Sequence, residues 1–213
     1  MNNYCEDIYK LFNNAKRFCF PFGDNEIPLN GIYILFEKGE FGHDVDRIVR
    51  IGTHTGKNQL SSRIYQHFLN DNKERSIFRK NIGRAILNKK NDKYLDVWEY
   101  DLTTKKNQEK YKNIIDIAKQ NEIEKEVTKY IQNNFSFSIL NINDKETILN
   151  IESKLISTIS LCNDCKPSKE WLGNYSTKDK IKKSGLWLVN ELWKVPLSGE
   201  DIDFIKGQVY YAV

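Results

Sequence analysis

A single glutamate, Glu152, interrupts the apolar face of a predicted helix. Residues three and four positions apart share a helix face, and those neighbours are Ile148, Leu149, Leu155 and Ile156. Burying an unpaired carboxylate is costly, so Glu152 requires a cation, a hydrogen-bond network or an opening to solvent. Two interpretations follow: a carboxylate paired with an internal arginine or lysine, or a metal ligand at the floor of a cleft.

Two further residues, Arg63 and His67, are spaced four apart on a shorter predicted helix. They lie beside Leu60 on the inward edge of that helix. A guanidinium presents a fixed fork of donors to phosphate oxygens, and an imidazole can transfer a proton near neutral pH. With Lys57 in the preceding loop, this set would suit a phosphodiester, although such spacing also arises by chance.

Tyr33 follows Gly31 at the start of a predicted strand, and Arg50-Ile51-Gly52 ends the next one. Glycines at strand edges often mark a bulge or the close approach of another backbone. A tyrosine in a strand is more commonly an amphipathic core residue than a reactive one.

Basic residues gather between positions 73 and 90, where Glu74 is the only acidic residue. The basic residues are Lys73, Arg75, Arg79, Lys80, Arg84, Lys89 and Lys90. Such a cluster predicts either a phosphate-binding surface or a solvated helix face.

The chain of 213 residues is 39% hydrophobic and 29% charged, which is typical of a globular protein and not of a disordered one. No apolar run approaches the roughly 18 residues that a membrane span needs, and the first residues lack the apolar core of a signal peptide. We therefore expect a cytoplasmic protein.

The chain contains Cys5, Cys19, Cys162 and Cys165, of which the last two form a single C-x-x-C motif. A structural zinc ion would need two further ligands, and Cys5 and Cys19 do not resemble a second close pair. This pattern favours ordinary reduced thiols over a zinc site.

The hydrophobic pattern predicts one mixed α+β domain. Strands are expected at 31–37 and 47–52, joined by a long loop, and at 94–102 and 135–142. Helices are expected at 59–70, at 76–87 with Ser76 as N-cap, at 107–133, and at 144–160 with Asp144 as N-cap.

The order of these residues resembles the GIY-YIG nuclease superfamily. The matching residues are Gly31-Ile32-Tyr33, Arg50-Ile51-Gly52, Arg63 with His67, Glu152 and Asn174. The resemblance is close over 30–68 and moderate over 146–176, and Arg50 replaces the second family tyrosine.

The resemblance implies a small antiparallel three-stranded sheet flanked by helices, with 94–102 as the third strand. It divides a single domain, 1–213, into a catalytic core of 30–102 and 145–176, a helical insertion of 103–144 and a C-terminal extension of 177–213.

The resemblance also implies a DNA endonuclease that uses one Mg²⁺ or Mn²⁺ ion held by Glu152. Tyr33 would be the general base, activated by cations such as Arg50 or Arg63, because a free tyrosine is a weak base at neutral pH. Arg63 would stabilise the phosphoryl transition state, His67 would assist proton transfer, and Asn174 would complete the site.

DNA is the expected partner, bound through Lys57, Arg75, Arg79, Lys80 and Arg84. A homodimer would suit an enzyme that cuts both strands of a palindrome. A sequence-specific restriction-type enzyme and a structure-specific repair nuclease both stay open. The main alternative is a catalytically inactive nucleic-acid-binding module of the same fold, and a protein-interaction domain is the third.

Overall fold

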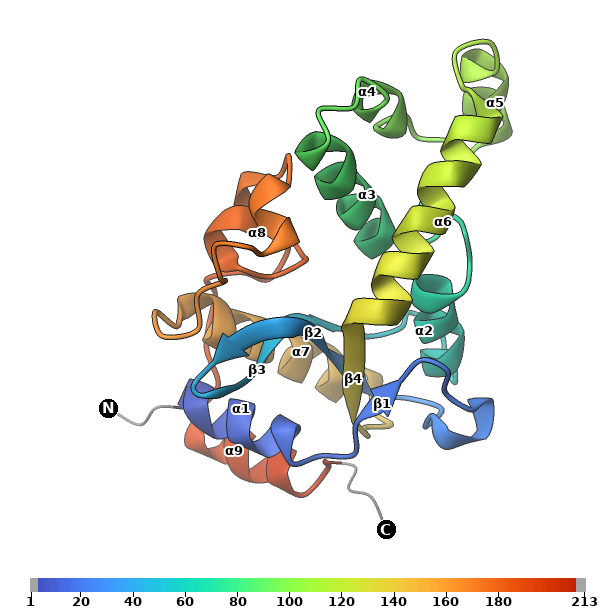
Figure 1. The fold of residues 1–213 in the computed structure, drawn as a ribbon. Coiled ribbons are helices and arrows are strands. Elements are labelled where there is room, and N and C mark those ends of the chain that lie inside the picture. The colour runs from blue at the N-terminus through green and yellow to red at the C-terminus, as the bar shows by residue number, and fades with distance from the viewer. Residues whose placement is uncertain (1–3, 210–213) are drawn as a thin grey trace.

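The computed structural model describes residues 4–209, except for the side chain of Asp24, and arranges them in three layers (Figure 1). A central sheet contains the strands β1 (Phe18–Cys19), β2 (Ile32–Gly42), β3 (Val45–Gly52) and β4 (Phe135–Leu140). The helices are α1 (Tyr4–Asn13), α2 (Leu60–Phe68), α3 (Ile77–Lys89), α4 (Leu95–Trp98), α5 (Lys105–Tyr111), α6 (Ile117–Asn134), α7 (Lys145–Leu161), α8 (Asp179–Ser184) and α9 (Gly199–Lys206), with short 3-10 turns η1 (Asp24–Glu26) and η2 (Leu172–Tyr175).

The sheet is antiparallel, in the order β1-β4-β2-β3, so β3 forms one edge. β2 and β3 form a hairpin whose register pairs Tyr33 with Gly52 and Leu35 with Arg50. Both predicted strands are confirmed, but the long loop expected between them is wrong. The strands continue to a two-residue turn at His43 and Asp44, whose positive φ values of 52° and 63° match the twist of a tight hairpin.

The third strand predicted at 94–102 is wrong. Residues Leu95–Trp98 form the short helix α4, and the strand that pairs with the other edge of β2 is β4. β4 lies within 103–144, the range expected to be a helical insertion. A short apolar run is compatible with a helix or a strand, and in this segment the packing of Trp98 favours the helix. Its indole covers Gly83, and its Nε1 donates to the Lys80 carbonyl at 3.0 Å.

Each face of the sheet packs against its own set of helices (Figure 1). The side chains of Ile32 and Ile34 share a core with α1, α7 and α9. Those of Tyr33 and Leu35 face the opposite way, into a core with α2, α3 and α6. Gly31 opens this strand because a Cβ there would lie 2.3 Å from the Leu140 carbonyl oxygen of β4, and its φ of +143° favours glycine.

The remaining helix predictions are confirmed, with one division. The helices at 59–70, 76–87 and 144–160 correspond to α2, α3 and α7, and Ser76 and Asp144 cap α3 and α7 through their side chains. The single helix expected at 107–133 is two helices, α5 and α6, because Asp116 caps a new helix by accepting from the Lys119 amide.

The C-terminal segment runs along the exposed edge of β3. The Trp187 amide donates to the Val49 carbonyl at 2.7 Å. The indole nitrogens of Trp171 and Trp187 donate to the same buried carboxylate oxygen, Oε2 of Glu37, at 2.7 and 2.8 Å. These bonds fix the residues after Trp187 beside α7. No helix among residues 4–209 is both long enough and apolar enough to cross a membrane.

Candidate active site

The two helix layers meet at the edge of the sheet where β3 ends, and cavities open there. One, of about 430 Å³, is lined by Arg50 and Ile51 of β3, by residues of α3 and α7, and by Leu188–Glu191. A second, of about 620 Å³, begins at Thr53 and includes Lys57 and Arg63. A third, of about 380 Å³, shares residues with both, so the three adjoin one another around the end of β3.

Glu152 lines the first cavity from α7, as the interpretation of a carboxylate at a cleft floor predicts. Burial raises the pKa of its carboxyl to about 6, while the nearby Arg50 guanidinium and the Thr53 amide act in the opposite direction. The neighbouring Glu191 carboxylate raises the pKa further, and Arg63 lowers it. Glu152 is therefore half-buried among charges of both signs and opens into a cavity.

The sequence did not indicate three polar residues of this cavity, Asn81, Asn190 and Glu191. Glu191 adopts a left-handed φ of 60° and accepts a hydrogen bond from Ser153 Oγ at 2.5 Å. Lys194, at 2.8 Å, and Ser153 hold the pKa of Glu191 below its usual range, so this carboxylate is ionised at neutral pH. The only signal in the sequence is a polar Asn-Glu pair inside the apolar segment Leu186–Trp193.

These side chains fit a hard divalent cation. Glu152, Glu191 and Asn190 line one cavity, and Mg²⁺ prefers the carboxylate and amide oxygens that such side chains offer, together with water. Both carboxylates line this cavity, and the charge of Glu191 contributes to the raised pKa of Glu152. A cation between them would relieve the mutual repulsion that raises the pKa of Glu152.

Arg50, which stands where the family has its second tyrosine, is almost fully buried on the wall of this cavity. Its guanidinium lies 5.1 Å from the centroid of the Phe78 ring and donates to the Trp187 carbonyl. Its Nε and the Nδ2 of Asn81, which lines the same cavity, have no hydrogen-bond partner among the described residues. The wall therefore carries donors whose hydrogen bonds are not satisfied within this part of the chain.

Tyr33 and His67, two residues of the predicted site, are in direct contact. The Tyr33 hydroxyl lies 2.8 Å from His67 Nε2, and His67 Nδ1 lies 2.7 Å from Ser76 Oγ. Burial, together with Arg63, Arg50 and Arg79, holds the pKa of His67 well below its usual range, so the imidazole is neutral. Tyr33 is only 1% exposed and lines none of the three cavities.

Gly52 explains the position of the Tyr33 hydroxyl. Tyr33 and Gly52 are paired across the hairpin, and a Cβ at Gly52 would lie 2.2 Å from the hydroxyl oxygen. Glycine is therefore needed here to make room for the tyrosine. The next residue, Thr53, lines the second cavity, so the Tyr33 hydroxyl lies beside the residue that directly precedes the cavity wall in the chain.

Arg63 lies at the second cavity, where Lys57, in the loop before α2, is exposed. Its Nη1 donates to Gln66 Oε1 and to the Arg75 carbonyl, both at 3.0 Å, which orients the guanidinium. Arg63 interacts electrostatically with both Glu152 and His67. The structure thus brings Tyr33, Arg50, Arg63, His67 and Glu152 to one end of β3.

Asn174 does not belong to this group. Its side-chain amide donates to the carbonyls of Ser168 and Lys169, at 2.9 and 3.0 Å, and it lines none of the three cavities. The amide stabilises the turn η2, which packs on α3. The structure does not bring Asn174 into the predicted site, and two other asparagines, Asn81 and Asn190, line the first cavity.

The predicted DNA-binding surface on α3 is wrong for Arg79, Lys80 and Arg84. Arg79 is fully buried and pairs with Glu124 at 2.8 Å, Lys80 donates to the carbonyls of Glu99 and Tyr100, and Arg84 pairs with the Glu99 carboxylate. These side chains hold α4 and α6 against α3 and cannot reach a DNA backbone. Arg75 and Lys57 are exposed, as a role in DNA binding requires.

The comparison with protein families agrees with the order of these residues. The family model described as the GIY-YIG domain matches residues 4–205. No curated protein and no solved structure gives a significant match. The match covers all of 103–144, the range expected to be an insertion, and most of 177–213, the range expected to be a C-terminal extension. The second range contributes Leu188–Glu191 to the first cavity. The chain belongs to the GIY-YIG domain family.

Proposed function

We propose that this protein is a metal-dependent DNA endonuclease whose centre lies at the end of β3. The observation that carries this proposal is the cavity in which Glu152, Glu191 and Asn190 meet Arg50, with Arg63 beside it. The carboxylates can hold a divalent cation, and the guanidiniums beside them can hold a phosphate. Metal-dependent phosphodiester hydrolysis uses both features.

Glu152, Asn190 and Glu191 would hold Mg²⁺ or Mn²⁺, which, when bound, supplies Lewis-acid stabilisation of charge on the scissile phosphate and the leaving oxygen. Glu152 must be ionised to bind a cation, and its pKa of about 6 allows this at neutral pH. Binding by Glu191 would require it to release Lys194. Asn190 takes the role that the sequence assigned to Asn174.

Arg63 and Lys57 would hold the phosphate oxygens. Arg63 is fixed by Gln66 and the Arg75 carbonyl, so its guanidinium is already oriented when charge develops on the phosphoryl group. Arg50 stabilises the ionised form of Glu152 and so maintains its affinity for a cation. The unpartnered Arg50 Nε and Asn81 Nδ2 support an anionic ligand in this cavity.

Tyr33 would accept the proton of the attacking water as that water's oxygen bonds to phosphorus and the P–O bond to the leaving group breaks. In the tautomer of the neutral His67 imidazole that carries its proton on Nδ1, Nε2 would accept the hydrogen bond from the Tyr33 hydroxyl 2.8 Å away and could take the tyrosine proton. Because Tyr33 is buried, this step requires bound DNA to admit a water molecule beside Gly52.

The burial of Tyr33 favours the second candidate, a nucleic-acid-binding module without catalytic activity. The test is to incubate supercoiled and linear DNA of varied sequence and structure with the purified protein, with and without Mg²⁺. We expect Mg²⁺-dependent nicking that is lost in Glu152→Gln and in Tyr33→Phe, while Asn174→Ala has no effect beyond stability. No cleavage of any substrate, together with DNA binding that is unchanged in Glu152→Gln, would establish the binding module instead.

A further inference from the structure

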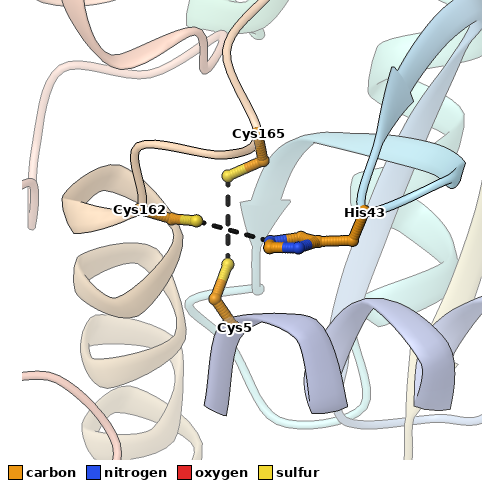
Figure 2. A group of neighbouring side chains, drawn as sticks. All are labelled: Cys5, His43, Cys162 and Cys165. Atoms are coloured by element: carbon orange, nitrogen blue, oxygen red, sulfur yellow. Dashed lines mark hydrogen bonds between the residues drawn. The ribbon is translucent and has the colours of Figure 1, made fainter. Parts of the chain in front are cut away.

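Three cysteines and one histidine from distant parts of the chain converge at the end of the sheet opposite Gly52 (Figure 2). Cys5 lies on α1, His43 in the turn between β2 and β3, Cys162 directly after α7, and Cys165 three residues further on. Figure 2 shows all four side chains pointing toward one centre. Cys19, the remaining cysteine, is exposed and stands apart from this cluster.

The spacing of the four ligand atoms is compatible with a tetrahedral metal site. All four lie within 4.8 Å of one another, with Cys5 Sγ 3.9 Å from Cys165 Sγ and Cys162 Sγ 3.3 Å from His43 Nε2. Zn–S bonds of about 2.3 Å and Zn–N bonds of about 2.0 Å in a tetrahedron give S–S edges of about 3.8 Å and S–N edges of about 3.5 Å. The two observed distances lie close to these edges.

The backbone around the cluster is shaped to bring the ligands together. His43 has a left-handed φ of 52°, which turns its side chain toward α1 and α7, and its ring packs edge-on against Tyr9 at 5.0 Å. The preceding residue must be small, because a Cβ at Gly42 would lie 3.0 Å from both Cys165 Cβ and Tyr9 Cε1. The Asp164 amide donates to Cys162 Sγ at 3.4 Å, a contact that would stabilise a thiolate.

We propose that Cys5, His43, Cys162 and Cys165 bind a structural Zn²⁺ ion. Three thiolates and one imidazole are a preferred zinc ligand set, and four protein ligands leave no position open for catalysis. The sequence showed only the C-x-x-C motif, because Cys5 and His43 lie more than 100 residues before it. The sequence favours ordinary reduced thiols because Cys5 and Cys19 are not a second close pair, whereas the fold supplies Cys5 and His43 as the two further ligands.

A disulfide explains this arrangement less well. A disulfide bond is about 2.05 Å long, and the Cys5 and Cys165 sulfurs lie 3.9 Å apart. One disulfide would also leave the third cysteine and His43 without a purpose in the cluster. The described cysteines are all free thiols.

The zinc site would fix one end of α7 and thereby help to position Glu152. Cys162 follows Glu152 by ten residues, so at about 1.5 Å of rise per residue the two sites are about 15 Å apart along the helix. The ion would tie α1, the β2–β3 turn and the end of α7 together. It is distinct from the Mg²⁺ site proposed for the cleft, which is built from oxygen ligands.

The test is the metal content of the full chain, purified under reducing conditions from zinc-supplemented medium and dialysed against a weak chelator. We expect about one zinc ion per chain in the wild type and in two control variants, Cys19→Ser and Glu152→Gln. Cys162→Ser and His43→Ala should each lose most of the bound zinc. Wild type without stoichiometric zinc, or ligand variants that retain it, would overturn the proposal.

Cobalt substitution keeps the proposal testable even if the ligand variants do not fold. Co²⁺ bound to wild type and to Cys19→Ser should give the visible d–d bands of tetrahedral Co²⁺ and near-ultraviolet thiolate-to-Co²⁺ bands. Zn²⁺ should abolish these bands by competition, and a large excess of Mg²⁺ should not. The absence of thiolate-to-Co²⁺ bands would contradict the site.

Discussion

At the scale of single residues, Glu152 is a carboxylate held where burial opposes its charge. The structure provides partial compensation through Arg50, Arg63 and the Thr53 amide, while Glu191 adds a second negative charge. A folded protein tolerates such a position when a ligand restores the balance. The pH dependence of stability therefore reports on Glu152 independently of any nuclease activity.

We predict that Glu152→Gln stabilises the protein at pH 7.5 without added Mg²⁺, but not at pH 4.5. The pKa of Glu152 is raised from 4.5 to about 6 by folding, so the folded state binds the proton more tightly than the unfolded state. Its contribution to stability is fully present below about pH 4.5 and is lost as the pH rises through 6. Glutamine resembles the protonated form at every pH.

Urea unfolding of the wild type and the variant at the two pH values measures this difference. The expected result is a higher midpoint for the variant at pH 7.5 and nearly equal midpoints at pH 4.5. Added Mg²⁺ should raise the midpoint of the wild type alone. A difference between the two proteins that does not change with pH would contradict the proposed environment of Glu152.

Several site residues could be predicted from the sequence because their signals are local. Glu152 disrupts a helical stripe, and Arg63 and His67 share a helix face. Asn190 could not be predicted in this way, because its place in the cleft depends on a hydrogen bond between Trp187 and Val49, 138 residues apart in sequence. Asn174 was chosen instead because it lies in the expected order along the chain.

At the scale of elements, α3 shows how charged residues can belong to the interior. A helical pattern separates apolar from charged positions, and it predicts a solvated face wherever arginines and lysines gather. In α3 these side chains meet carboxylates and carbonyls of α4 and α6, which periodicity cannot reveal. The strand predicted at 94–102 failed for a related reason, since Trp98 packs against Gly83 and not into the sheet.

We predict that Glu124→Gln destabilises the protein by about 3–5 kcal/mol, because the buried guanidinium of Arg79 then keeps only the more distant and more exposed Asp71, at 3.4 Å, as a charge partner. Glu124 accepts from Arg79 at 2.8 Å and from the Lys73 amide. Glu122 on the same helix is the matched control, since its side chain is 71% exposed, and Glu122→Gln should change stability by less than about 0.5 kcal/mol.

Chemical denaturation of the two variants under the same conditions decides this prediction. Similar stabilities for both would show that the Arg79–Glu124 pair does not stabilise the packing of α3 on α6. Under conditions where both variants are fully folded, each should bind DNA with the affinity of the wild type.

At the scale of the whole molecule, the site depends on the contact between two helix layers at the edge of β3. α7 brings Glu152 from one layer, α2 brings Arg63 from the other, and the segment after Trp187 closes the cleft. The α+β class and the order of the motifs could be predicted from local patterns. The closing segment could not, because it depends on tertiary contacts between Glu37 and the two tryptophans.

The position of the cleft indicates which basic residues of the molecule contact DNA. The net charge is only +4, so affinity should depend on where the charges lie. We predict that Lys57→Ala lowers the slope of log affinity against log salt concentration by about 1, the change expected for one lost phosphate contact. Lys206→Ala, an exposed lysine on α9, should leave the slope unchanged.

Fluorescence anisotropy with a labelled duplex, at several salt concentrations and with Ca²⁺ in place of Mg²⁺, measures these slopes. Equal effects of Lys57→Ala and Lys206→Ala would mean that the cleft at the end of β3 is not where DNA binds.

The most direct measurement of the proposed activity is the single-turnover rate of plasmid nicking as a function of Mg²⁺ concentration. We expect the wild type to show a saturable rate, Glu152→Gln to be inactive at all concentrations, and Asn190→Ala and Glu191→Gln to need more Mg²⁺. Arg63→Ala should reduce the saturated rate by about 10²–10³-fold, because it removes a preorganised donor to the phosphoryl group. A Glu152→Gln variant that nicks DNA at the wild-type rate and with the same Mg²⁺ dependence would contradict the account.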